Sequence, residues 1–188
     1  MKKKNLLYVS ALCACMSFSF IGCSDDDDKQ EIPSLPEQIS LNGVYVLNSG
    51  NKGNNNSSLS FYDFETKKVE ADIFKKVNGR GLGDTANDIL VYGSKAYIAV
   101  TNSNTIEVTD LQGKSLKQIV SDGDPLQPRF FTCYNGKVYV SLYEGYVARL
   151  DTTSLSIESK VKVGRNPEQM AIANNKLYVA NSGGADFN

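Results

Sequence analysis

Residues 134–140, Tyr-Asn-Gly-Lys-Val-Tyr-Val, decide the fold of this 188-residue chain, because their pattern recurs along it. A tyrosine between two apolar residues occurs four times, at Tyr45, Tyr97, Tyr139 and Tyr178, with intervals of 52, 42 and 39 positions. The last two intervals are close to the roughly 40 residues of one four-stranded propeller blade, and longer loops account for the first interval. The pattern therefore predicts a repeat protein.

A tight turn precedes three of these tyrosines, at residues 93–95, 135–137 and 174–176. Asn and Gly tolerate positive backbone dihedrals, so each turn predicts a hairpin. In the clearest unit we expect strands at 130–134, 137–142, 146–151 and 156–163. Apolar and polar residues alternate in residues 147–150 and in residues 105–108, as half-buried strands require. We predict an all-β fold, a β-propeller of four-stranded antiparallel blades, with about three and a half blades present of an expected seven.

Composition excludes several function classes. The chain has no histidine, which removes His-activated nucleophiles, imidazole metal sites and His general-base chemistry. Lys and Arg number 20 against 21 Asp and Glu, but Lys2, Lys3 and Lys4 lie in the predicted leader, so 17 basic residues remain (20 − 3). The mature chain is therefore mildly acidic, and nucleic acid is not an expected partner. We expect no catalytic residue, no cofactor and no metal site, and we interpret the protein as a non-enzyme.

The N-terminal residues resemble targeting sequences that direct a protein to a location. Residues 1–22 combine a lysine-rich start with a short apolar stretch, as a secretory signal peptide does. Phe20-Ile21-Gly22-Cys23 resembles the bacterial lipobox, which implies that Cys23 is lipidated and anchors the chain. The following acidic run, Asp25 to Asp28, resembles the lipoprotein export signal of Bacteroidota, which implies an outer-membrane, cell-surface location. The alternatives are a retained anchor helix, an unmodified cysteine and a calcium-binding acidic run.

Domain limits follow from these features. Residues 1–22 form the signal peptide, 23–40 the lipidated cysteine, export signal and Pro-containing tether, and 41–188 a partial propeller domain. The repeat stops after the second strand of a unit, from which we infer a truncated product or a fragment. Self-association into a ring is the alternative.

The repeats also resemble a known group. Tyr178-Val-Ala-Asn181, residues 97–102 and residues 105–110 resemble the YVTN-type β-propeller repeats of bacterial surface proteins. Residues 43–48, 59–63, 78–84 and 163–169 resemble propeller lipoproteins of gut Bacteroidota. That group includes a cell-surface cobalamin-binding protein that works beside a TonB-dependent transporter.

The blade order places the loops that enter first strands and the loops that join second to third strands at one end. Arg, Asn, Gln and Tyr side chains in these loops suit a polar ligand. The candidate ligand-binding residues are Arg80, Asp84, Asn87, Asn102, Arg129, Tyr143, Arg165, Glu168, Gln169 and Asn181. The alternative for each is a structural role in fixing turns and joining neighbouring blades.

Two other residue groups have structural interpretations. Cys133 lies in a predicted first strand, where we expect a small core residue, and no disulfide is available once Cys23 is lipidated. Asp122 and Asp124 could act as an acid and base pair, but two acids in a loop are weak support for an enzyme.

The resemblance implies a surface lipoprotein that captures a nutrient, cobalamin-like or a glycan, and delivers it to a TonB-dependent outer-membrane transporter. It would touch the membrane only through its lipid. A propeller lyase or lactonase and a protein-binding scaffold are the alternatives.

Overall fold

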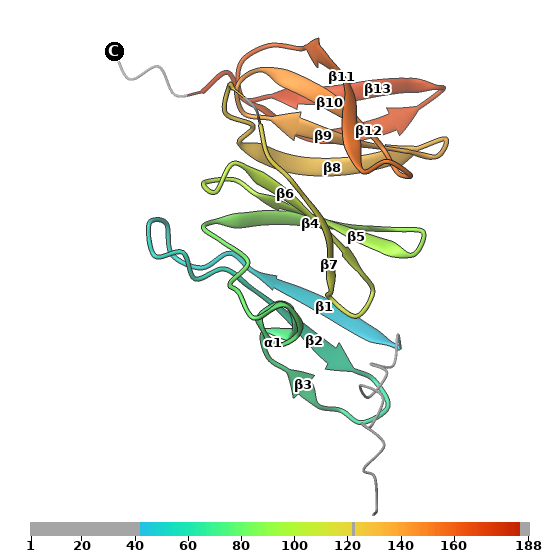
Figure 1. The fold of residues 1–188 in the computed structure, drawn as a ribbon. Coiled ribbons are helices and arrows are strands. Elements are labelled where there is room, and N and C mark those ends of the chain that lie inside the picture. The colour runs from blue at the N-terminus through green and yellow to red at the C-terminus, as the bar shows by residue number, and fades with distance from the viewer. Residues whose placement is uncertain (1–41, 122, 185–188) are drawn as a thin grey trace, which may run out of the picture. The chain divides into compact units, whose positions relative to one another are not determined.

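The computed structural model describes residues 42–121 and 123–184, whose path is drawn in Figure 1. Cys23, the predicted signal peptide and tether, and Asp122 lie outside the described residues. Within those ranges the chain forms thirteen strands and one short helix. No helix of this part has the length and apolarity needed to span a membrane.

The strands form four antiparallel sheets, which we call blades I to IV. Blade I contains β1 (Gly43–Asn48), β2 (Ser58–Asp63) and β3 (Val69–Glu70), and blade II contains β4 (Ala86–Tyr92), β5 (Lys95–Val100), β6 (Thr105–Asp110) and β7 (Ser115–Ile119). Blade III contains β8 (Pro128–Tyr134), β9 (Lys137–Leu142), β10 (Tyr146–Asp151) and β11 (Ser156–Lys162), and blade IV contains β12 (Pro167–Ala173) and β13 (Lys176–Asn181). Strands that follow one another in the chain pair with one another, so each blade is a meander. The prediction of an all-β fold built of antiparallel blades is confirmed, and blades II and III have the predicted four strands.

Three of the four repeated tyrosines occupy equivalent places. Tyr97, Tyr139 and Tyr178 lie on β5, β9 and β13, the second strands of their blades, and Tyr45 lies on β1. In blade III the predicted second and third strands match β9 and β10, while β8 begins two residues earlier than predicted and β11 ends one residue earlier. The turn between β8 and β9 has φ values of 47° at Asn135 and 78° at Gly136, as an Asn-Gly hairpin requires.

The sequence pattern did not predict the helix α1 (Ile73–Asn78). Its six residues are too few to show a helical period. The Asp72 carboxylate accepts a hydrogen bond from the amide of Lys75 at its start, and Gly79, at φ 68°, ends it. Together with the loop of residues 49–57, this helix explains why the first tyrosine interval is the longest.

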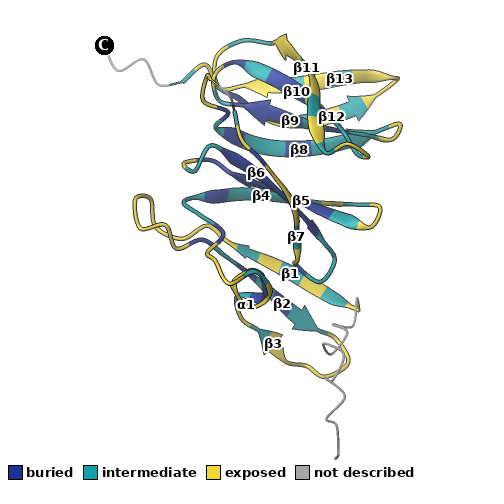
Figure 2. Ribbon diagram, in the orientation of Figure 1, coloured by how far each residue is buried: buried dark blue, intermediate teal, exposed yellow. Residues whose placement is uncertain are grey.

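The core lies between the blades. One buried cluster joins blades I and II and includes Leu59, Phe61, Phe74 and Ile98, and a second joins blades II and III. β5 is buried along almost its whole length because both of its faces are covered, whereas β1 and β13 alternate between exposed and half-buried residues (Figure 2). A single sheet cannot bury its own faces, so the stability of each blade depends on its neighbours.

Candidate functional site

The entering loops and the joining loops lie at one end of blades II to IV, as predicted. We call this end the rim and define it as residues 79–85, 101–104, 123–127, 143–145, 163–166 and 182–184. The antiparallel register brings them together, since Ala86 pairs with Val100, Pro128 with Leu142 and Pro167 with Asn181. We call the first strand of each of these blades (β4, β8 or β12) its inner strand. Residues just before the inner strand therefore lie beside residues just after the second strand.

One backbone hydrogen bond repeats in all three blades. The amide of Thr101 donates to the carbonyl of Thr85 at 2.9 Å, and the amide of Tyr143 donates to that of Gln127 at 3.0 Å. In blade IV the amide of Ser182 donates to the carbonyl of Asn166 at 3.0 Å. The rim loops are thus held as pairs by the backbone itself.

The accepting residue of each pair has a left-handed backbone. Its φ is 58° at Thr85, 40° at Gln127 and 50° at Asn166. Positive φ is uncommon outside glycine, and it is most strained for a β-branched residue such as threonine. The strain recurs at the same repeat position, immediately before the inner strand. Sequence reasoning missed these three residues, because only Asn166 is of a type that favours this conformation.

A ladder of side chains crosses the inner strands. The Asn87 side chain donates to the carbonyl oxygen of Arg129 at 2.7 Å. Arg129 in turn donates through Nε and Nη2 to Glu168 at 3.2 and 2.9 Å. Its guanidinium also lies 5.3 Å from the centre of the Tyr143 ring, a cation–π distance. These candidate residues occupy one repeat column, and their contacts join blade II to blade III and blade III to blade IV.

Arg80 binds a buried carboxylate. Its Nη2 lies 2.9 and 3.0 Å from the two oxygens of Glu107, whose side chain is 0 % exposed while that of Arg80 is 41 % exposed. The guanidinium also lies 4.8 Å from the centre of the Phe74 ring on α1. Ser115 and Gln118 donate further hydrogen bonds to the same carboxylate. Arg80 therefore neutralises Glu107 and attaches the α1 insertion to blade II.

Sequence reasoning missed Glu107. Its strand, Thr-Ile-Glu-Val, alternates in a way that predicts a solvent-facing glutamate. Glu107 pairs with Ile98, which belongs to the core cluster between blades I and II, so its side chain lies on the face that packs against blade I and Arg80 covers its carboxylate. The sequence offered two signals, the arginine Arg80 in a Gly-rich insertion and the lone acid Glu107 within a strand. Only the fold shows that these two residues are paired.

Asp84 and Asn102 organise the rim between blades I and II. One oxygen of Asp84 accepts from the amide of Gly53 at 2.8 Å, and the other accepts from the Thr85 hydroxyl at 2.8 Å. The Asn102 side chain donates to that same hydroxyl at 3.1 Å. Asp84 thus fixes the long loop of blade I against blade II, and Asn102 remains exposed at the surface.

Three exposed candidate residues lie in or beside blade IV. Arg165, Gln169 and Asn181 are all exposed. The Asn181 side chain donates to the carbonyl of Val163 at 2.8 Å, and the Arg165 carbonyl accepts from the amide of Gly183 at 3.3 Å. These side chains offer guanidinium and amide groups for hydrogen bonding to a polar ligand.

A charged cluster lies at the opposite end of blade III. Lys137 contacts Asp151 at 2.7 Å and Glu158 at 2.5 Å, and Arg149 contacts Glu158 at 2.8 Å. The Lys137 ammonium, followed by the amide of Ser154, holds the pKa of Asp151 well below its usual range. The hydrogen bonds from Lys137 to Asp151 and then to Glu158 raise the lysine pKa. Across residues 42–121 and 123–184, no group of three Asp, Glu or Cys side chains is placed to hold a metal ion.

Cys133 lies at the inner strand of blade III as a free, half-buried thiol. It packs against the core cluster between blades II and III. Cys133 thus borders the core with which it was predicted to pack, and it is not one of the fully buried core residues.

Solved structures support the fold. The chain is 19 % identical to a chain of the hydrazine synthase of Kuenenia stuttgartiensis over 63 % of its own length, with a TM-score of 0.51, and it spans 33 % of that chain. It is 10 % identical to the computationally designed Ika4 protein, covering 68 % of this chain and 76 % of that one, with a TM-score of 0.54. A chain of the mitotic checkpoint complex matches at 9 % identity and a TM-score of 0.53, over 73 % of this chain and 40 % of that one. At such identities the likeness shows the propeller-like fold alone.

No curated protein matches the sequence. One family model covers residues 42–185, which include all four blades, and its description is a domain of unknown function, DUF5074. The repeat, the blade topology and this match agree, and the chain belongs to the DUF5074 family.

Proposed function

We propose that this protein is a surface-exposed outer-membrane lipoprotein that binds a nutrient ligand, cobalamin-like or a glycan, and delivers it to a TonB-dependent transporter. The observation that carries the proposal is the rim. Loops of three successive blades are hydrogen-bonded in pairs and leave amide, guanidinium and phenol groups along one end. A held backbone with outward polar side chains is the usual construction of a binding face.

The candidate residues differ in their availability to a ligand. Arg80, Asn87, Arg129 and Glu168 use their polar groups in contacts within and between blades. The exposed Asn102, Arg165, Gln169 and Asn181, with the half-buried Tyr143, are the proposed ligand contacts. Asn102, Arg165 and Asn181 also make contacts within the fold, so they are chosen for their exposure and not for a lack of partners. A ligand with several hydroxyl or amide groups, such as a corrinoid or an oligosaccharide, matches these donors and acceptors.

The location rests on the N-terminal sequence. A lipidated Cys23 behind a short signal peptide would anchor the domain, and the acidic run would direct it to the cell surface. Labelling of cells with an alkyne fatty acid should modify the wild-type protein and not Cys23→Ala. Protease added to intact cells should remove the anchored protein. Protection from protease in intact cells would contradict surface exposure.

Ligand binding is tested by isothermal titration of the purified lipoprotein with cyanocobalamin and with a panel of oligosaccharides. The double variant Asn102→Ala/Asn181→Ala should weaken binding by about ten-fold or more, since each lost hydrogen bond removes about 0.5–1.5 kcal/mol. Lys176→Gln, an exposed change on β13, is the matched control and should bind normally. Absence of heat with every ligand would refute nutrient capture, and consumption of a ligand during titration would favour the enzyme alternative.

A further inference from the structure

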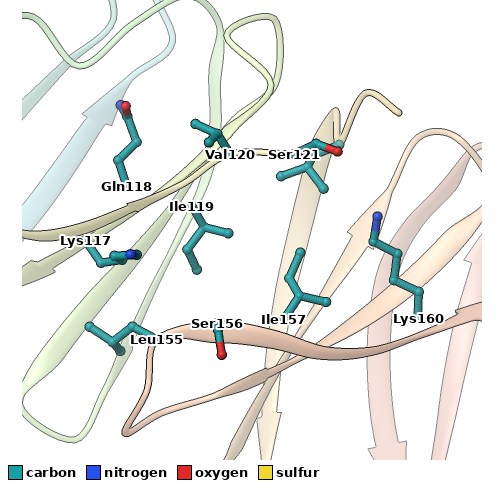
Figure 3. A pocket seen from close by; sticks show the side chains of 10 residues that line it. Lys117, Gln118, Ile119, Val120, Ser121, Leu155, Ser156, Ile157 and Lys160 are labelled. Carbon is teal, nitrogen blue, oxygen red and sulfur yellow. The ribbon is translucent and has the colours of Figure 1, made fainter. Parts of the chain in front are cut away.

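A groove lies between the outermost strands of blades II and III. It has a volume of about 460 Å³, and its lining residues come from the segment 117–121, from Leu126 and from the start of β11 (Figure 3). None of the ten candidate ligand-binding residues lines it, and Leu126 is the one lining residue that belongs to the rim. It is therefore a separate feature of the surface.

The floor of the groove is apolar. Ile119, Leu155 and Ile157 point into it in Figure 3, and they continue the core cluster between the two blades. Val120, at the border, is 54 % exposed. An apolar side chain placed here would leave water and contact the existing core.

Two lysines border this floor on opposite sides. Lys117 and Lys160 are exposed, and no hydrogen bond or ion pair of their ammonium groups is found among the described residues. Glu158 is the one acid on the two outer strands, and it is already paired with Lys137 and Arg149. The groove thus has unbalanced positive charge at both ends of an apolar centre.

The groove also has free strand edges. β7 and β11 are the last strands of their sheets, so one side of each has no partner strand in the described part of the chain. α1 covers only the beginning of β7, where the amide of Ser115 donates to the Asn78 side chain at 2.8 Å. Residues 117–119, which follow on β7, line the groove. An unpaired edge is a template for another extended chain.

We propose that this groove binds an extended acidic segment of a partner protein. The segment adds to the edge of β7, inserts an apolar side chain over Ile119 and Ile157, and places one carboxylate at Lys117 and another at Lys160. Alternate residues of an extended chain share a face, so the segment follows the pattern acid, any residue, apolar, any residue, acid. The free edge selects a peptide over a small amphiphile, since only a peptide uses backbone hydrogen bonds as well as charge and apolar contact.

The test uses the full chain and the acetylated, amidated pentapeptide Glu-Thr-Leu-Thr-Glu. Titration followed by amide chemical shifts should show saturable binding with a Kd below about 1 mM, with shifts concentrated at residues 117–121 and 155–160. Lys117→Gln and Lys160→Gln should each weaken binding by about two- to five-fold, as exposed ion pairs do. Lys176→Gln, outside the groove, is the matched control, and thermal unfolding checks that each variant folds.

Three outcomes would overturn the proposal. The first is no saturable binding of the pentapeptide. The second is equal binding of a Lys-Thr-Leu-Thr-Lys peptide, which would show that the two lysines do not select an acidic peptide. Equal binding of a version of the pentapeptide N-methylated on the backbone would likewise show that hydrogen bonds to the edge of β7 do not contribute. The third is dodecanoate occupying the same residues when the pentapeptide does not, which would make the groove a site for small amphiphiles.

Discussion

Arg80→Met should destabilise the fold, because it removes the partner of another residue, the buried Glu107. The substitution leaves Glu107, 0 % exposed, without its cation. Breaking a buried ion pair from one side costs about 3–5 kcal/mol. The figure is smaller here, because Arg80 is 41 % exposed and because Ser115 and Gln118 still donate to the carboxylate. We expect a loss of about 2–3 kcal/mol in the free energy of unfolding, which for a domain of this size lowers Tm by about 5–10 °C.

A double-mutant cycle separates the charge effect from simple loss of packing on Phe74. Glu107→Gln keeps the shape of the side chain and removes its charge, so it should cost about 1 kcal/mol. Arg80→Met in that background should cost about 1–2 kcal/mol less than it does alone, because no buried charge is left unpaired. Urea unfolding followed by tyrosine fluorescence measures each value, since the chain has 10 tyrosines and no tryptophan.

The matched control is Arg149→Met. Arg149 also pairs with a glutamate, but their side chains are 46 % and 26 % exposed, so this loss should stay below about 1 kcal/mol. Equal effects of Arg80→Met and Arg149→Met would show that the buried charge of Glu107 does not set the cost. Additivity of the Arg80 and Glu107 substitutions would show the same.

Further perturbations test other parts of the structure. Arg129→Ala should cost about 1–2 kcal/mol in urea unfolding, because it removes the Glu168 pair and a cation–π contact; an unchanged midpoint would show that the inter-blade ladder adds no stability. The pKa of Asp151 lies below its ordinary value in the folded state, so its stabilising effect is present above about pH 4 and is lost as the pH falls toward the folded-state pKa. Tm measured between about pH 5 and pH 2.5 should therefore fall less steeply in Asp151→Asn than in wild type, and parallel curves would exclude this residue as a source of acid sensitivity. Gly43→Ala should destabilise blade I by about 1–3 kcal/mol, since its Cβ would collide with the carbonyl oxygen of Tyr62; wild-type thermal unfolding would contradict this.

The sequence predicted the blades well because their determinants are local. A strand needs alternating residues and a hairpin needs a turn that accepts positive φ, and both signals lie within a few positions of Tyr97, Tyr139 and Tyr178. The four-strand unit and the placement of the rim loops at one end follow from the meander alone. The helix α1 was not predicted, because its six residues are too few to show a helical period.

The candidate site was less predictable. The repeat aligned Asn87, Arg129 and Glu168 in one column. The sequence did not show that these residues contact one another across blades. The same list of polar loop residues contains members bound within the fold and members exposed to solvent. Residue type is the same in both cases, so sequence alone does not separate them.

The sequence by itself determined the strands, their order within each blade and the end at which the loops gather, because these depend on neighbours along the chain. The tertiary structure alone decided that Glu107 is buried against Arg80, that Arg129 is paired with Glu168, and that Lys117 and Lys160 border one groove. Each of these facts depends on how one sheet packs on the next. Burial and charge pairing are properties of such packing, and residues 27 and 39 positions apart become partners only when the blades stack.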